Sequence, residues 1–228
     1  MKNVLVSGAS GHLGQAVIRH FLDEGNQVAG IAGRNKGLPF SGDPLYHHYQ
    51  ADLRDETAAA DVVTQLISQW QRIDVAVLTA GGYAGGTLAG TTPASVHEQL
   101  QLNFDTAYNL ARPAWLQMMK QGYGRLFLIG SRPGLNMAQA HGSLAYGLSK
   151  SLLFRLAEVL NHDAGTANVV TSVVVPSTID TPPNREAMPD ADFNKWVKPG
   201  TIAALIAYHS SEAADALRAP IIKVYNTA

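Results

Sequence analysis

Cysteine is absent from this 228-residue chain. The absence excludes a disulfide framework, a thiolate nucleophile and zinc held by cysteine, so redox chemistry would need a bound cofactor. Charge is also scarce and balanced, with 17 Lys and Arg against 18 Asp and Glu and a formal net charge of -1. Because no basic stripe could neutralise the phosphates of a duplex, we expect a small-molecule substrate and no nucleic-acid partner.

Long apolar runs are missing as well. The longest stretches, such as residues 169–176, are strand-sized and fall far short of the roughly 20 residues that cross a bilayer. The first seven residues lead into a strand pattern and lack the apolar region and cleavage site of a signal peptide. We therefore expect a cytoplasmic protein with no membrane partner. The eight histidines form no His-x-x-x-His pair beside an acid, and no metal site is expected.

Short β-branched runs alternate with segments of helical period along the whole chain. Several runs are apolar at consecutive positions, which indicates a parallel sheet covered on both faces. The pattern predicts one domain over residues 1–228 with an α/β, doubly wound Rossmann fold, in which helices cover both faces of a mostly parallel sheet of about seven strands. Strands are expected at residues 4–6, 28–31, 75–78, 126–129, 169–175 and 221–224, with a weaker one at 46–50, and helices at 12–24, 56–70, 95–120, 145–161 and 201–211.

The segment over residues 177–199 differs from the rest in its proline content. Pro182, Pro183, Pro189 and Pro199 all lie within it. Proline removes a backbone donor and breaks helices, so this segment cannot form one long helix. We expect it to be a lid over a cleft.

A glycine-rich turn joins the first strand to the first helix. Gly8 permits the tight turn, Gly11 lets the backbone approach a pyrophosphate, and Gly14 allows helix and strand to pack closely. Such turns also occur without a ligand, but the position between strand and helix favours dinucleotide binding. The other residues of the turn that we expect at the cofactor are Ser10, His12 and Leu13.

The choice of dinucleotide depends on the residues after the second strand. An acidic residue there would bind the ribose 2′-hydroxyl of NAD, and none is present. Arg34 lies there instead and offers a forked donor to a 2′-phosphate, with a solvated loop charge as the lesser alternative. We therefore expect NADP(H), with NAD(H) as the alternative. Asp52, after the third strand, is expected either to accept a hydrogen bond from the adenine or to cap the next helix.

Tyr146 and Lys150 lie four residues apart near the start of a predicted helix, so both side chains share one face. A cation at about 4 Å and an effective ε near 20 supplies about 4 kcal/mol, enough to lower the pKa of a tyrosine from about 10 toward 7. Tyr146 would donate a proton to a carbonyl or imine, or accept one from an alcohol, while hydride moves to or from a nicotinamide.

Two polar residues are candidate partners of this pair. Ser131 follows the fifth predicted strand and is expected to hydrogen-bond the reacting oxygen, with a turn or capping role as the alternative. Asn103 is an awkward residue for a helix interior, so we expect it either to face the site through water or to face solvent.

The order of these features resembles the short-chain dehydrogenase/reductase family over essentially the full length. The resemblance implies that Lys150 also holds the nicotinamide ribose, that Asn103 holds a relay water and that Thr181 approaches the carboxamide or phosphates. It also implies pairing of long helices between subunits, giving a homodimer or homotetramer. Ser131 precedes Tyr146 by fifteen positions, slightly more than is usual in the family, so Ser143 is a second candidate. Further cofactor contacts are implied for Leu53, Ala80, Gly81, Gly82, Pro176 and Thr178.

Two segments, residues 80–86 and 179–196, resemble the quinoid dihydropteridine reductases of this family. The resemblance implies that Tyr83 forms a wall for a flat ring and that Trp196 belongs to a substrate lid. Ser131 and Asn103 are departures from those reductases, which leaves the substrate open. The expected activity is NAD(P)H-dependent reduction of a carbonyl or quinonoid imine, with dihydropteridine reduction as one alternative and a non-catalytic NADP-sensing regulator as another.

Overall fold

A seven-stranded sheet forms the centre of the computed structural model, which describes residues 1–33 and 38–227. The strand order is β3-β2-β1-β4-β5-β6-β7, and every neighbouring pair is parallel. The expected fold class is therefore confirmed, including the weaker strand, which becomes edge strand β3. The strands are β1 (Asn3–Ser7), β2 (Gln27–Ala32), β3 (Tyr46–Gln50), β4 (Val75–Leu78), β5 (Tyr123–Ile129), β6 (Asn168–Pro176) and β7 (Ile221–Val224).

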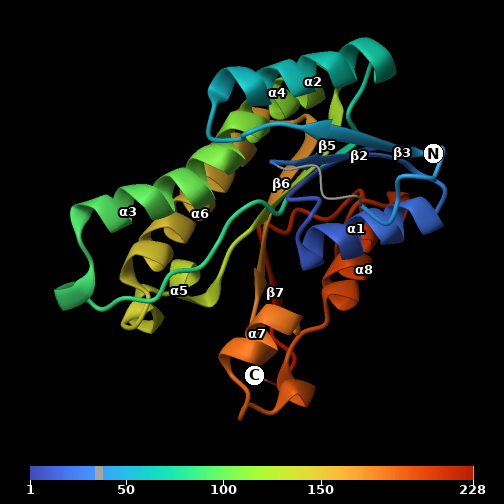
Figure 1. The fold of residues 1–228 in the computed structure, drawn as a ribbon. Helices are drawn as coiled ribbons and strands as arrows, with labels where there is room; N and C mark the ends of the chain where they lie inside the picture. Colours follow the sequence, from blue (N-terminus) through green and yellow to red (C-terminus); the bar gives the residue numbers. More distant parts are fainter. Residues whose placement is uncertain (34–37, 228) are drawn as a thin grey trace.

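Helices cover the two faces of the sheet (Figure 1). One face carries α1 (His12–Asp23) and α8 (Pro199–His209), and the other carries α2 (Glu56–Trp70), α4 (Thr106–Gln121) and α6 (Leu144–Ala164). Three shorter helices are α3 (Pro93–Leu100), α5 (Arg132–Leu135) and α7 (Pro182–Ala187). No helix in the described ranges is both long and apolar enough for a bilayer crossing.

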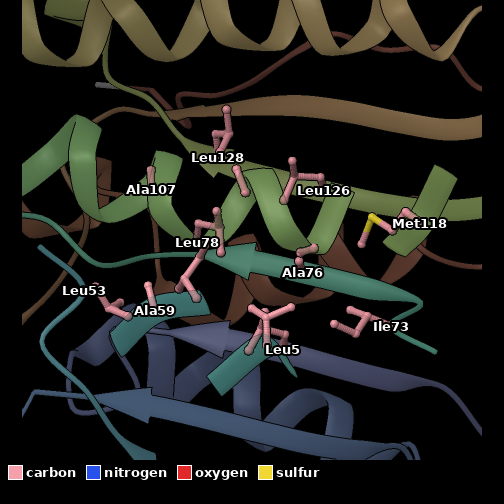
Figure 2. Close-up of a cluster of buried hydrophobic side chains, with 14 of the residues drawn as sticks. Leu5, Leu53, Ala59, Ile73, Ala76, Leu78, Ala107, Met118, Leu126 and Leu128 are labelled. Carbon is pink, nitrogen blue, oxygen red and sulfur yellow. The ribbon is translucent and has the colours of Figure 1, made fainter. Parts of the chain in front are cut away.

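A hydrophobic core lies on each face of the sheet, and these two cores explain why the strands are apolar at consecutive positions. Successive strand residues point to opposite faces, so Leu5 of β1 joins one core while Val4 and Val6 join the other. Figure 2 shows part of the first core, to which Leu5 of β1, residues of β4 and β5 and Met118 of α4 all belong. Each large aliphatic side chain buried in this way contributes about 1.5–3 kcal/mol.

The single helix expected at residues 95–120 is interrupted. A π-helical turn at Gln101–Asp105 separates α3 from α4, and Asn103 lies inside it. The helix also begins earlier, at Pro93, because Thr92 and Ser95 form a reciprocal capping box. A π turn adds one residue to a single turn of a helix, and so local a change is not detected by the periodicity of the whole segment.

The proline-rich segment is not one long helix, as expected. It contains α7 and a 3-10 turn at Phe193–Lys195. Its two ends meet, since the Asp180 amide donates to the Val197 carbonyl (2.8 Å) and the Val197 amide donates to the Thr178 carbonyl (2.9 Å). The segment is thus a loop closed at its base at the carboxyl edge of β6. Its action as a lid stays a prediction.

Candidate active site

The glycine-rich turn lies where the strand order reverses, between β1 and β4, which is the usual ligand crevice of such sheets. Gly8 has φ +67°, and a Cβ there would lie 2.7 Å from Thr79 Oγ1. A Cβ at Gly14 would collide with the Gly8 carbonyl, while the Gly11 amide donates to that carbonyl at 2.8 Å. The turn therefore depends on glycine at positions 8 and 14.

Helix α1 begins directly after the turn with open donors. Gly11 is its N-cap, and among the described residues no side chain accepts a hydrogen bond from its first amides. The first amides of a helix point outward and its dipole favours negative charge, so this end suits a pyrophosphate. Ser10 and His12 are exposed beside it, and Leu13 is half-buried. These residues fit the expected cofactor contacts.

The ends of β1 and β4 are tied together by two side chains that the sequence analysis did not single out. Thr79 Oγ1 donates to the Ser7 carbonyl at 2.6 Å, and the Ala80 amide donates to Ser7 Oγ at 3.1 Å. Ser7 ends β1 and Thr79 directly follows β4. A small polar residue at the carboxyl end of an apolar strand is the sequence signal that could have identified each of them. The two bonds hold the turn and residues 80–82 in one arrangement.

The residues expected to bind the adenosine half of the cofactor are described only in part. Arg34 lies outside the described residues, so its selection of a 2′-phosphate stays a prediction. The alternative that Asp52 caps the next helix is wrong, because Asp55 accepts from the first amides of α2. Asp52 instead binds Arg54 through both carboxylate oxygens (2.6 and 2.9 Å), and these hydrogen bonds lower the pKa of Asp52 to about 2. Leu53 is buried, and its carbonyl accepts from Asn109 Nδ2.

Ser131 and Tyr146 meet at the carboxyl edge of β5. Ser131 is the N-cap of α5 and its Oγ accepts from the Gly134 amide at 3.1 Å, so the capping role is real. The same hydroxyl hydrogen-bonds the Tyr146 side chain. Burial raises the pKa of Tyr146, and the bond with Ser131 acts in the opposite direction. Tyr146 is therefore a phenol that keeps its proton at neutral pH.

Lys150 lies on the same face of α6 as Tyr146 and is buried. Its Nζ donates to the Ile129 carbonyl at 2.8 Å and lies 6.0 Å from the centroid of the Tyr146 ring. Burial lowers the pKa of Lys150 to about 8. The expectation that Lys150 alone lowers the pKa of Tyr146 is wrong for this structure, because burial of the phenol outweighs any attraction from an ammonium at that distance.

Asn103 has no exposed surface, so the solvent-facing alternative is wrong. Its carboxamide pairs with both polar groups of one residue: the Gly82 amide donates to Oδ1 and Nδ2 donates to the Gly82 carbonyl, each at 3.0 Å. Between Asn103 and Lys150 lies Gly81, with φ +155°. A Cβ on Gly81 would lie 2.6 Å from Asn103 Oδ1 and 3.3 Å from Lys150 Nζ. The π turn thus brings Asn103 beside Lys150.

Besides Ser131 and Tyr146, the two other expected substrate residues occupy different places. Tyr83 is 69% exposed, and its ring lies edge-on to Tyr146 with centroids 5.1 Å apart. Trp196 is buried, its ring lies 4.8 Å from Phe193, and it lines a cavity of about 450 Å³ to which neither Tyr146 nor Ser131 contributes among the described residues. The structure therefore brings Tyr83 to Tyr146 but does not bring Trp196 there.

The residues expected after β6 lie at the same edge of the sheet as Ser131, one strand further along. Pro176 ends β6, and the Thr178 carbonyl belongs to the base of the closed loop. Thr181 is the N-cap of α7, and its side chain accepts from the Asn184 amide at 3.4 Å.

Comparisons with known proteins point to one family. A sequence profile described as short chain dehydrogenase matches residues 2–192. The cyclohexanol dehydrogenase of Rhodococcus sp. (strain TK6) is 28% identical over 191 residues, which cover 77% of this chain and 70% of that protein. The dihydropteridine reductase of Dictyostelium discoideum is 28% identical over 205 residues, or 89% and 84% of the two chains.

A solved structure agrees with these matches. The crystal structure of an oxidoreductase of the short-chain dehydrogenase/reductase family from Burkholderia thailandensis superimposes with a TM-score of 0.86 and 28% identity. The match covers 99% of this chain and 91% of that one.

Proposed function

This chain belongs to the short-chain dehydrogenase family of oxidoreductases, and we propose that it reduces a carbonyl or quinonoid imine with NADP(H), using Tyr146 as proton donor. The observation that carries the proposal is the meeting of Ser131, Tyr146, Lys150 and Asn103 at the carboxyl edge of β4 and β5. A hydroxyl partner, a phenol and a cation together suit proton transfer to a reacting oxygen or nitrogen.

The glycine-rich turn fits the cofactor, because glycine lets its backbone fold tightly against Thr79 and leads directly into the uncapped first amides of α1. NADP(H) supplies the hydride when bound. The outward amides of α1 would hold its pyrophosphate, and Lys150, beside Gly81, would hold the nicotinamide ribose. The preference for NADP(H) over NAD(H) rests on Arg34 and on the lack of an acidic residue after β2.

The state of Tyr146 favours the reductive direction. Its raised pKa keeps the phenol protonated at neutral pH, which is the form that donates. Ser131 would hydrogen-bond the substrate atom that receives the proton and so orient it toward Tyr146. Once the proton has left, the Lys150 ammonium would stabilise the phenolate on the same helix face.

A quinonoid dihydropterin is the second, more specific candidate. The exposed ring of Tyr83 beside Tyr146 offers a flat wall to a planar heterocycle. The two relatives carry different activities in their names, an alcohol dehydrogenase and a pteridine reductase, so their likeness supports the reaction type and leaves the substrate to experiment.

The test follows the absorbance of NADPH and NADH with a quinonoid dihydropterin and then with a panel of aldehydes and ketones. We expect oxidation with one of these acceptors. We also expect Tyr146→Phe to lower turnover by about a thousandfold or more, within the range seen when a catalytic proton donor is removed, while NADPH binding is retained. Unchanged turnover in Tyr146→Phe would exclude the proposed role. Tight NADPH binding without oxidation of any acceptor would favour the regulator instead.

A further inference from the structure

Ser149 connects the catalytic helix to Asn103. It lies on α6 between Tyr146 and Lys150 in the sequence and has no exposed surface. Its Oγ donates to the Tyr146 carbonyl at 2.8 Å and accepts from Asn103 Nδ2 at 3.2 Å. One hydroxyl thus joins the backbone of the proton donor to the side chain that holds Gly82.

We propose that Ser149 is a positioning residue for catalysis: it holds the Asn103 carboxamide toward α6 and so sets where Gly81 and Gly82 lie relative to Lys150. The proposal rests on the proposed function.

The positioning role of Ser149 follows from the donors of the Asn103 carboxamide and the acceptors around them. A carboxamide nitrogen has two hydrogens, and the Gly82 carbonyl takes one of them. The second hydrogen has three acceptors in reach, namely Ser149 Oγ (3.2 Å), Gln99 Oε1 (3.2 Å) and the Gln99 carbonyl (3.3 Å). Two of these acceptors belong to Gln99 on α3 and only one belongs to α6.

Loss of the Ser149 hydroxyl would therefore leave the second hydrogen entirely to Gln99. The carboxamide would then be drawn toward α3, and Gly82 would follow it because both of its polar groups are bonded to Asn103. Gly81 has little freedom to absorb the change, since a Cβ there would touch both Asn103 and Lys150. The expected result is a misplaced loop beside a fold that is otherwise intact.

Ser151 provides a matched control on the same helix. Its Oγ donates to the Leu148 carbonyl at 2.7 Å, three residues back, as Ser149 Oγ does to Tyr146. The Ser151 bond is exposed, and in the described part of the chain Asn103 makes its hydrogen bonds to Gly82, Gln99 and Ser149 instead. Ser149→Ala and Ser151→Ala therefore remove the same local bond, and only the first also removes the link to Asn103.

The experiment measures kcat, substrate KM and the NADPH dissociation constant for both variants with the best acceptor found for the wild-type protein. We expect Ser149→Ala to lower kcat about tenfold, the coupling typical of residues in contact, with little change in NADPH binding. Ser151→Ala should behave as the wild type. In an Asn103→Ala background, Ser149→Ala should cause no further loss, because its effect passes through Asn103.

Equal kcat in Ser149→Ala and Ser151→Ala, or a full additional loss in the Asn103→Ala background, would overturn the proposal. If Ser149→Ala does not fold, Ser149→Cys takes its place, because it keeps nearly the same volume with a much weaker acceptor and should show the same pattern at smaller size. Tyr146→Phe is measured alongside. Turnover that survives in Tyr146→Phe refutes the proposed function itself, whereas an inactive Tyr146→Phe with a fully active Ser149→Ala refutes only the role of Ser149.

Discussion

Asn103 and Asn161 make the same pair of hydrogen bonds to two different parts of the backbone. Asn103 pairs with the amide and carbonyl of Gly82, both at 3.0 Å, and Asn161 pairs with those of Thr171, both at 2.8 Å. Each carboxamide thus replaces a neighbouring strand for one residue. What differs is the segment that each asparagine holds.

Asn161 completes the sheet. It lies half-buried on a regular helix, α6, and binds β6 ahead of the point where β7 begins to pair with that strand, at Val173. Asn103 is fully buried in a π turn and binds a glycine loop beside Lys150. The same bonding pattern thus holds a strand of the sheet in one place and a loop beside the proposed proton-transfer pair in the other.

The largest effect should follow Asn103→Leu. The change leaves both polar groups of Gly82 unpaired and releases the loop beside Lys150, so we expect kcat to fall by about a hundredfold or more, as when one preorganised donor is lost from an active site. Steady-state kinetics and NADPH titration test this. A kcat within twofold of the wild type would show that Asn103 is only structural, like Asn161.

The next effect concerns pH. Burial lowers the pKa of Lys150 to about 8, so the ammonium is present below that pH and is lost above it. We expect kcat for reduction to fall by about tenfold per unit above pH 8, since one proton is lost. Lys150→Arg retains a cation at high pH and should move this decline upward.

Asn161→Leu is the control for the pH measurement and should keep the wild-type profile. A decline at the same pH in Lys150→Arg would assign the titration to another group.

The smallest effect on turnover should follow Asn161→Leu, which acts on stability. It leaves the Thr171 amide and carbonyl unpaired near the start of β6, and this should cost about 1–3 kcal/mol of the free energy of unfolding. Urea unfolding monitored by circular dichroism measures it. We expect kcat within twofold of the wild type, and a loss of turnover at unchanged stability would break the contrast with Asn103.

Local patterns predicted most of the fold and part of the site. Runs of β-branched residues located the strands because both faces of a parallel sheet are buried. The glycine spacing located the tight turn between β1 and α1, and its binding of a cofactor stays a prediction. The spacing of four between Tyr146 and Lys150 was sufficient to place them on one face of α6, since helical periodicity is local.

Other features depended on contacts between distant segments. Periodicity did not reveal the π turn that buries Asn103. No sequence pattern indicated that Ser149, and not Ser151, is the hydrogen-bond partner of Asn103. Trp196 matched a segment of known reductases, yet it packs against Phe193 away from Tyr146. The pKa of Tyr146 also went against expectation, because burial, which depends on everything packed around the phenol, exceeds the influence of one nearby residue.

The sequence by itself determined the order of strands and helices, the glycine turn and the helix that carries Tyr146 and Lys150. These features follow from backbone conformation and from side-chain spacing within a few residues. Only the tertiary structure decided that Asn103, Gly82 and Ser149 meet, although they come from three separate segments. Hydrogen bonds between buried groups depend on positions within a few tenths of an ångström, which the packing of the whole chain sets.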